Sequence, residues 1–179
     1  VDAVQAVEVV GNDCRAIDLN LGCPKLFSTQ GLFGSELLHR PEIVEDMIKS
    51  LKRNFNMPIT IKIRMLPEVR HTIDLLRRAE HCGVEAIAIH CRYKADRPRY
   101  QALPLMQLPI LSSLASVPLL YNGDIYSYHE IEQYKHISRG CWCVDVQPDE
   151  FAPFHKINCS CGSAITNAKG VQGVLIGRG

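Results

Sequence analysis

The sequence has 179 residues, of which 46% are hydrophobic and 22% are charged, and its formal net charge at pH 7 is +1. This composition is typical of one globular domain with an apolar core, and it excludes a disordered or fibrous chain. The small net charge does not indicate a nucleic-acid or membrane partner, so contact with a polyanion would need a local cluster of basic residues. No stretch is apolar enough to cross a bilayer and no signal peptide is visible, so we expect a cytoplasmic protein with no membrane contact.

The sequence contains eight cysteines, but their placement does not resemble a disulfide framework. The first four, at positions 14, 23, 82 and 91, are scattered over alternating helical and extended patterns. Such patterns are typical of intracellular α/β enzymes, in which cysteines stay reduced. We therefore expect free thiols.

Helices and strands alternate along most of the chain. Helical periodicity alternates with short apolar runs that end at glycine or polar residues. The predicted order is helix 1–10, strand 16–20, a helical turn through 37–38, helix 40–54, strand 59–63, helix 72–82, strand 86–89, helix 109–116, strand 117–121, helix 125–134 and strand 173–176.

The helix over 40–54 has the most complete signature. Pro41 suits its first position, acidic residues come early and basic residues come late, which matches the helix dipole. The helical spacing predicts one buried face. Its members are Ile43, Val44, Met47, Ile48 and Leu51.

Cys23 stands directly after the strand over 16–20. Gly22 and Pro24 prevent that strand from continuing, so the thiol lies where the backbone leaves the sheet. Ligands of parallel α/β folds bind at the carboxyl ends of strands, which makes Cys23 a candidate chemical group. The alternative is a small apolar core residue, and both interpretations remain open at this point.

Lys62 and His90 occupy similar places on later strands. Lys62 interrupts the apolar run Ile59–Ile63, and an isolated buried charge is costly unless it pairs or contacts a ligand. The alternative for Lys62 is an ion pair with a carboxylate on a neighbouring strand. His90 ends the strand over 86–89, where a structural role is the alternative to a catalytic one.

Three further segments carry candidate chemistry. Arg92–Tyr100 combines four basic residues with two aromatic ones, which suits phosphate contacts and base stacking, although a solvated basic loop is the alternative. Asn122-Gly123-Asp124 follows the strand over 117–121, where a glycine turn can direct N–H groups at an anion. Residues 136–170 lack periodicity and contain two C-x-C pairs, at Cys141, Cys143, Cys159 and Cys161, that permit a zinc site; a disordered loop or a gene-model artefact is the alternative.

Repeated strand–helix units with polar residues at every strand end predict consecutive parallel strands. An eight-stranded (β/α)8 TIM barrel is the favoured parent, because a doubly wound sheet would place its ligand at one switch point only. Such a barrel needs about 250 residues. We therefore expect residues 1–179 to form part of a barrel, roughly strands 4 to 8, with a Cys-rich insertion at 136–170 before the last strand.

These motifs together resemble the flavin-dependent tRNA-dihydrouridine synthases. The amino-acid sequences of the segments that contain Cys23, Lys62 and His90 are most similar to those of the eukaryotic branch that acts on tRNA position 20. The resemblance covers 1–134 and 173–179. The matching motifs are Asp18-Leu19-Asn20-x-Gly22-Cys23-Pro24 with Gly31, Lys62-Ile63-Arg64, Ile89-His90-x-Arg92, Asn122-Gly123-Asp124 and Ile176-Gly177-Arg178-Gly179.

The resemblance implies a catalytic domain that binds FMN, takes electrons from NADPH and reduces uridine in tRNA to dihydrouridine. Cys23 would protonate C5 of the uracil, which suits a thiol that is mostly protonated at neutral pH. The resemblance places Lys62 and His90 beside the flavin, and Asn20 and Arg92 beside the substrate. It places Asn122, Gly123, Asp124, Gly177 and Arg178 around the phosphate end of FMN. No metal ligand is implied.

The sequence departs from the family in three ways. Cys91 stands where the family more often has glycine. The early barrel strands and the helical tRNA-binding domain have no counterpart in the sequence, and the insertion at 136–170 is not part of the family pattern. The alternatives are an FMN barrel acting on a free pyrimidine, and a truncated product without catalysis that binds RNA or zinc.

Overall fold

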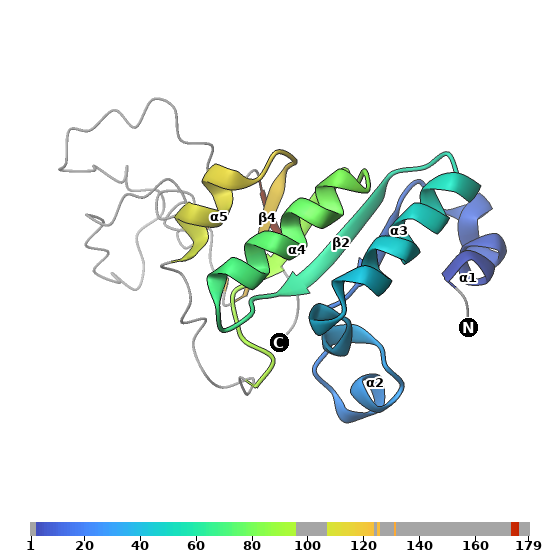
Figure 1. The fold of residues 1–179 in the computed structure, drawn as a ribbon. Helices are drawn as coiled ribbons and strands as arrows, with labels where there is room; N and C mark the ends of the chain where they lie inside the picture. The colour runs from blue at the N-terminus through green and yellow to red at the C-terminus, as the bar shows by residue number, and fades with distance from the viewer. Residues whose placement is uncertain (1–2, 96–106, 124, 126–130, 132–172, 176–179) are drawn as a thin grey trace, which may run out of the picture.

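The computed structural model describes residues 3–95, 107–123, 125, 131 and 173–175 (Figure 1). The described residues form a sheet of five strands, all parallel, in the order β1-β2-β3-β4-β5. The elements are α1 (Ala3–Val10), the 3-10 turn η1 (Gly11–Asp13), β1 (Ile17–Asn20), α2 (Leu26–Gln30), the 3-10 turn η2 (Gly34–His39), α3 (Pro41–Asn54), β2 (Ile59–Arg64), α4 (Val69–His81), β3 (Ala86–His90), α5 (Leu108–Leu114), β4 (Leu119–Asn122) and β5 (Gly173–Leu175).

The strand order confirms the predicted α/β class. Each strand pairs with its neighbour in sequence, as consecutive strand–helix units of a barrel do. A doubly wound sheet would reverse its order at a switch point, and the described strands contain no such reversal.

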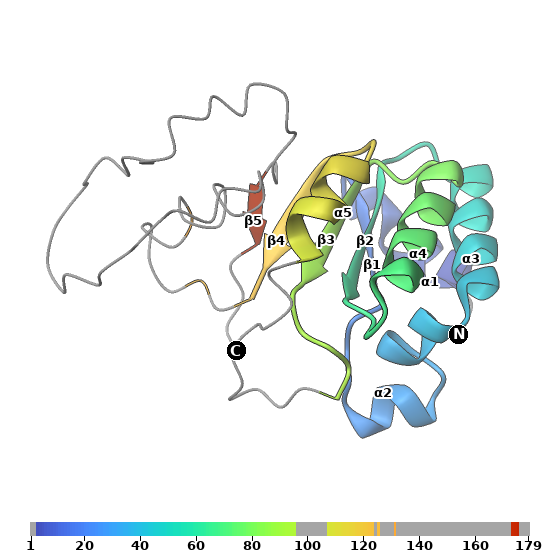
Figure 2. The same cartoon turned by 60° about the vertical axis from the view of Figure 1, so that its left-hand side comes forward.

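The helices α3, α4 and α5 lie side by side on one face of this sheet (Figures 1 and 2). That face is built from aliphatic residues at alternating strand positions, because successive side chains of a strand point to opposite faces. On β2 these are Ile59, Ile61 and Ile63, all 0% exposed. Val44 and Ile48 of α3 form one buried cluster with Ile61 and Ile63, while Leu51 of α3 packs with Ile59 in a second cluster. Apolar burial between the sheet and one layer of helices thus holds the fold together.

The opposite face of β2 carries Thr60, Lys62 and Arg64. The strand register extends this face sideways, since Lys62 is paired with Asn20 of β1, and Arg64 with His90 of β3. Polar side chains from neighbouring strands therefore gather on the face that α3, α4 and α5 leave uncovered.

One sequence prediction about this part of the fold is wrong, and one helix was not predicted. Ile43 is not in the buried face of α3 but 37% exposed, because the sheet contacts a narrower stripe that Val44, Ile48 and Leu51 fill. The loop after Cys23 forms the predicted helical turn through Leu37 and Leu38 as η2, and it also forms α2, for which no prediction was made. Of the predicted helix over 125–134 only residues 125 and 131 are described, and the insertion at 136–170, with its four cysteines, lies outside the described residues.

Replacing Ile48 by alanine should lower the free energy of unfolding by about 2–5 kcal/mol, because it removes buried methyl groups and leaves a cavity. Ile43→Ala is the matched control in the same helix and should cost less than about 1 kcal/mol. Urea unfolding of the two variants measures the difference. Equal losses would show that α3 packs on the sheet through a different face.

Candidate functional site

The carboxyl ends of the strands bring the predicted polar residues together. Arg64, His90 and Asn122 are successive partners across β2, β3 and β4. Asn20 and Lys62 are partners across β1 and β2. Since these strands are parallel, all five residues lie at one rim of the sheet.

Cys23 reaches this rim through a tight exit from β1. Leu21 N–H still donates to the carbonyl of Lys62 at 2.8 Å, so the chain follows β2 for one residue beyond the strand. Gly22 N–H then donates to Oδ1 of Asn20 at 3.1 Å, which turns the backbone away from the sheet. Asn20 therefore has a structural role through its oxygen, while its amide nitrogen makes no hydrogen bond within the described part of the chain.

The backbone of Cys23 is fixed by η2. Ser35 N–H donates to the carbonyl of Cys23 at 2.9 Å. Gly34 adopts a φ of +56°, and a Cβ at this position would lie 2.6 Å from the same carbonyl oxygen. Only glycine fits this close approach without moving the backbone.

The thiol of Cys23 is half-buried and accepts a hydrogen bond. Ser28 Oγ donates to Sγ at 3.2 Å. This bond, with a second from the backbone at Lys25, lowers the pKa of Cys23 against the opposing effect of burial. Cys91 is the contrasting case, because its full burial raises the pKa of its thiol. Cys23 is thus the more readily ionised of the two, which opposes the interpretation of Cys23 as an apolar core residue.

Lys62 projects onto the open face of the sheet. Burial lowers the pKa of its amine, and the positive charge of Arg64 lowers it further. The predicted alternative was an ion pair with a neighbouring carboxylate. Asp18, the carboxylate whose charge acts on Lys62, instead accepts a 2.7 Å hydrogen bond from Thr60 Oγ1. Among the described residues no ion pair with Lys62 forms, so its amine is available to a ligand.

His90 and Arg92 contact each other at the carboxyl end of β3. Arg92 Nη1 lies 3.1 Å from His90 Nε2. A guanidinium can only donate, so Nε2 is the acceptor and the proton of the neutral imidazole lies on Nδ1. Arg92 is 7% exposed, which places its charge inside the protein and not on a solvated loop.

Arg64 is the site residue whose role the sequence analysis did not identify. Its Nε donates to the carbonyl of Gly22 at 2.8 Å, and its Nη1 donates to the carbonyl of Tyr93 at 2.9 Å. The side chain is buried, and it links the loop after β1 to the loop after β3. The sequence did contain a signal for this role: Arg64 lies two residues after Lys62, which places both basic side chains on one face of β2.

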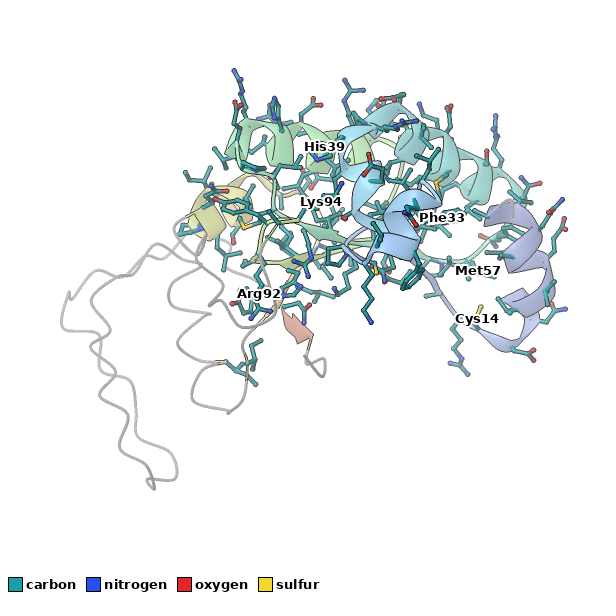
Figure 3. The ribbon with its side chains drawn as sticks, turned by 90° about the horizontal axis from the view of Figure 1, so that it is seen from below. Cys14, Phe33, His39, Met57, Arg92 and Lys94 are labelled. Atoms are coloured by element: carbon teal, nitrogen blue, oxygen red, sulfur yellow. The ribbon has the colours of Figure 1, made fainter. Side chains whose placement is uncertain are left out.

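The predicted basic loop is described only in its first part. Lys94 Nζ pairs with Glu36 Oε2 of η2 at 2.5 Å, and this pair lowers the pKa of Glu36. In Figure 3, which looks onto the carboxyl ends of the strands, Lys94 lies toward η2 while Arg92 lies farther toward the open face. These two residues are therefore held within the protein, and the rest of the loop, with Arg97 and Arg99, lies outside the described residues.

The predicted phosphate-binding residues are only partly described. Asn122 is 8% exposed, and its carbonyl accepts a 3.1 Å hydrogen bond from Cys91 N–H. Gly123 follows with a φ of +123°, a conformation that favours glycine and turns the chain at the rim. Asp124, Gly177 and Arg178 lie outside the described residues.

A family profile matches residues 2–144 of this chain and is described as dihydrouridine synthase (Dus). The chain belongs to the dihydrouridine synthase family. The match includes every motif of the predicted resemblance except the last, which lies beyond residue 144. It also includes the first residues of the segment predicted to be an insertion.

Curated relatives agree with this membership. A human protein named a tRNA-dihydrouridine(20a/20b) synthase, NAD(P)+-like, is 33% identical over 130 residues, which cover 71% of this chain and 40% of the relative. A Schizosaccharomyces pombe protein named a tRNA-dihydrouridine(20) synthase, NAD(P)+, is 34% identical over 142 residues, which cover 74% of this chain and 30% of the relative. The chain thus spans less than half the length of these relatives.

Solved structures with similar folds are distant in sequence. A dihydrodipicolinate synthase from Agrobacterium tumefaciens has a TM-score of 0.51 and 14% identity, covering 75% of this chain and 44% of that chain. A proposed phosphonomutase from Burkholderia cenocepacia has a TM-score of 0.55 and 7% identity, covering 78% of this chain and 61% of that chain. These similarities support the arrangement of strands and helices only. The Dus family has the TIM-barrel fold, and this chain has the parallel sheet and helix layer of part of such a barrel.

The described residues contain no cluster of three or more His, Cys, Asp or Glu side chains that could hold a metal ion. None of their helices combines the length and apolar character needed to cross a membrane.

Replacing Arg64 by methionine should loosen the Cys23 loop, because the carbonyls of Gly22 and Tyr93 lose their donors. We expect a loss of about 1–3 kcal/mol in the free energy of unfolding. Amide hydrogen exchange should also become faster at Ser35, whose N–H bonds to the Cys23 carbonyl. Hydrogen-exchange mass spectrometry measures this change.

Arg77→Met is the matched control, because Arg77 is exposed on α4. Its effect should stay within about 0.5 kcal/mol. Unchanged exchange around Cys23 in Arg64→Met would show that Arg64 does not hold the loop.

Proposed function

We propose that the protein containing this chain reduces uridine to 5,6-dihydrouridine in tRNA, with FMN as its bound cofactor and NADPH as its electron donor. The observation that carries this proposal is the position of the Cys23 thiol at the same rim as Lys62, His90 and Asn122. The names of the relatives support tRNA as the substrate and a nicotinamide cofactor as the reductant. They give no support to a free pyrimidine as the substrate.

The residues of the rim fit FMN. A flavin offers carbonyl oxygens and ring nitrogens along one edge, and its reduced form is an anion at neutral pH. Lys62 supplies a desolvated cation without an ionic partner among the described residues, and a bound anion would compensate it. Asn122 lies on the same face. We propose that Lys62 and His90 contact the ring, and that Asn122, Gly123, Asp124, Gly177 and Arg178 hold the phosphate end.

The bound cofactor would supply a hydride to C6 of the uracil. The chain's own contribution to the reaction is the proton. We propose that Cys23 donates its S–H proton to C5, so that an S–H bond breaks and a C–H bond forms. Because the pKa of Cys23 is lowered, its thiol is a stronger acid than an ordinary cysteine, which favours this transfer.

Asn20 and Arg92 are proposed to contact the substrate. The free amide nitrogen of Asn20 can donate to a uracil carbonyl, while its oxygen is used by Gly22. Arg92 is buried, which favours contact with the base over contact with the outer phosphate backbone. The relatives named for tRNA positions 20 and 20a/20b are nearly equally identical to this chain. We therefore propose the uridine at position 20 as the substrate only because the sequences of the motifs resemble that branch.

We further propose that residues 1–179 belong to the catalytic barrel domain and that 136–170 form an insertion in it. We propose a cytoplasmic location because the four described cysteines are all free thiols. Free cysteines are the rule in reducing compartments.

Cys23→Ala should abolish most dihydrouridine formation while leaving FMN content and its reduction by NADPH unchanged, since neither needs the thiol. We expect the single-turnover rate with tRNA to fall by about a hundredfold to ten-thousandfold. The rate is followed by flavin oxidation and normalised to FMN occupancy. Cys82→Ala, at the C-terminal end of α4, is the matched control. A wild-type rate in Cys23→Ala would remove Cys23 from the mechanism.

Lys62→Met should weaken FMN binding by about tenfold or more, because the flavin loses a charged donor. The same change should leave the apoprotein equally or more stable, since it removes a desolvated charge that lacks an ionic partner in the described chain. Fluorescence titration gives the FMN affinity, and urea unfolding of the apoprotein gives the stability. Lys49→Met on the exposed side of α3 is the control. Loss of stability with unchanged FMN affinity would make Lys62 a structural residue.

A further inference from the structure

Ser28 lies directly beside the Cys23 thiol, in the helix α2 that the sequence analysis did not anticipate. Its side chain is 7% exposed, and its Oγ is 3.2 Å from Sγ of Cys23. Burial of Ser28 strengthens such a bond, because little water competes for the donor.

The surrounding loop fixes Ser28 through its backbone. Its N–H donates to the carbonyl of Lys25 at 3.0 Å, and its own carbonyl accepts from Phe33 N–H at 2.7 Å. Ser35 closes the other side of the loop on the Cys23 carbonyl. The fold of residues 23–35 therefore holds the backbone of Ser28 beside Cys23, within reach of its sulfur.

The direction of this hydrogen bond connects it to the reaction. A neutral thiol is a weak acceptor, whereas a thiolate is a strong one. When Cys23 gives up its proton, negative charge develops on Sγ, and the Ser28 bond becomes stronger. A fixed donor aimed at a developing charge stabilises the transition state more than the ground state.

We propose that Ser28 is a positioning residue that holds the Cys23 thiol and stabilises the thiolate formed when Cys23 protonates the uracil. This inference rests on the proposed function of Cys23. In the step, the S–H bond breaks, its electron pair stays on sulfur, and the proton forms the new C5–H bond. The two electrons of the reduction arrive at C6 as hydride from the reduced cofactor, and solvent later returns a proton to the sulfur.

The molecule provides a matched control in Ser35. It is also a buried serine of the same loop, and it also contacts Cys23, but only through its backbone N–H. Its hydroxyl makes no hydrogen bond within the described residues. Removing the Ser35 hydroxyl therefore deletes the same atom from the same loop without touching the sulfur.

The first test measures the thiol without tRNA or turnover. The FMN-loaded protein is alkylated with iodoacetamide across a range of pH, and the Cys23 peptide is quantified by mass spectrometry. Only the thiolate reacts, so the rate at neutral pH reports how readily Cys23 ionises. Ser28→Ala should slow alkylation by about twofold to tenfold and move the pH profile upward. Ser35→Ala should leave the profile unchanged.

An unchanged profile in a folded Ser28→Ala protein would overturn the proposal. If Ser28→Ala does not fold, Ser28→Thr and Ser28→Val make the same comparison, because the two differ only in a hydroxyl and a methyl group. Threonine should retain the wild-type profile and valine should lose it. Equal profiles for this pair would overturn the proposal as well.

The second test measures the reaction. Ser28→Ala should lower the single-turnover rate of tRNA reduction by about twofold to tenfold while leaving FMN occupancy and reduction by NADPH unchanged. A changed alkylation profile with an unchanged single-turnover rate would overturn the proposed effect of Ser28 on the proton transfer. A wild-type rate in Cys23→Ala is a separate failure, because it would overturn the proposed function of Cys23 itself.

Discussion

The alternation of side chains along β2 is the constraint on which the rest of the structure depends. Its isoleucines face the helices, and its intervening residues face the open side of the sheet. Because successive residues of a strand point to opposite faces, burial of the isoleucines forces Lys62 and Arg64 onto the other face. A register slip of one residue would expose the isoleucines and bury both charges. The energy of the apolar core therefore also fixes the position of the site.

Arg64 extends this constraint to the loops. One guanidinium bonds to the backbone after β1 and after β3, so the two loops that carry Cys23 and Arg92 are tied to β2, the strand between β1 and β3. Backbone carbonyls are the acceptors, which means that the link does not depend on the side chains of those loops. Rigid placement of reacting groups lowers the activation free energy by several kcal/mol, because the groups no longer lose translational and rotational freedom when they react. This pair of hydrogen bonds from Arg64, the Arg64 clamp, thus helps to hold Cys23 in place for the proposed proton transfer.

The two cysteines at the sheet illustrate how surroundings decide chemistry. Cys91 is enclosed by the core, and burial raises its pKa, which keeps it as an unreactive thiol. Cys23 follows β1, two strands away from Cys91 in the sheet, with a hydroxyl donor beside it, and its pKa is lowered. The residue type is the same in both cases. The difference arises because hydrogen-bond donors stabilise negative charge on the sulfur of Cys23, whereas burial disfavours that charge on Cys91.

The sequence by itself determined the order of the elements, the parallel α/β class, the family and the rim residues Cys23, Lys62, His90 and Asn122. These features depend on local periodicity, on strand ends and on motifs, all of which are read along the chain. Only the tertiary structure decided the helix α2, the exposure of Ile43, the clamp by Arg64, the pairing of Lys94 with Glu36 and the contact of Ser28 with Cys23. Each of these features depends on which segments contact each other in the folded chain and on how far that contact buries them from water. The spacing of residues along one strand or helix encodes neither the contact nor the burial.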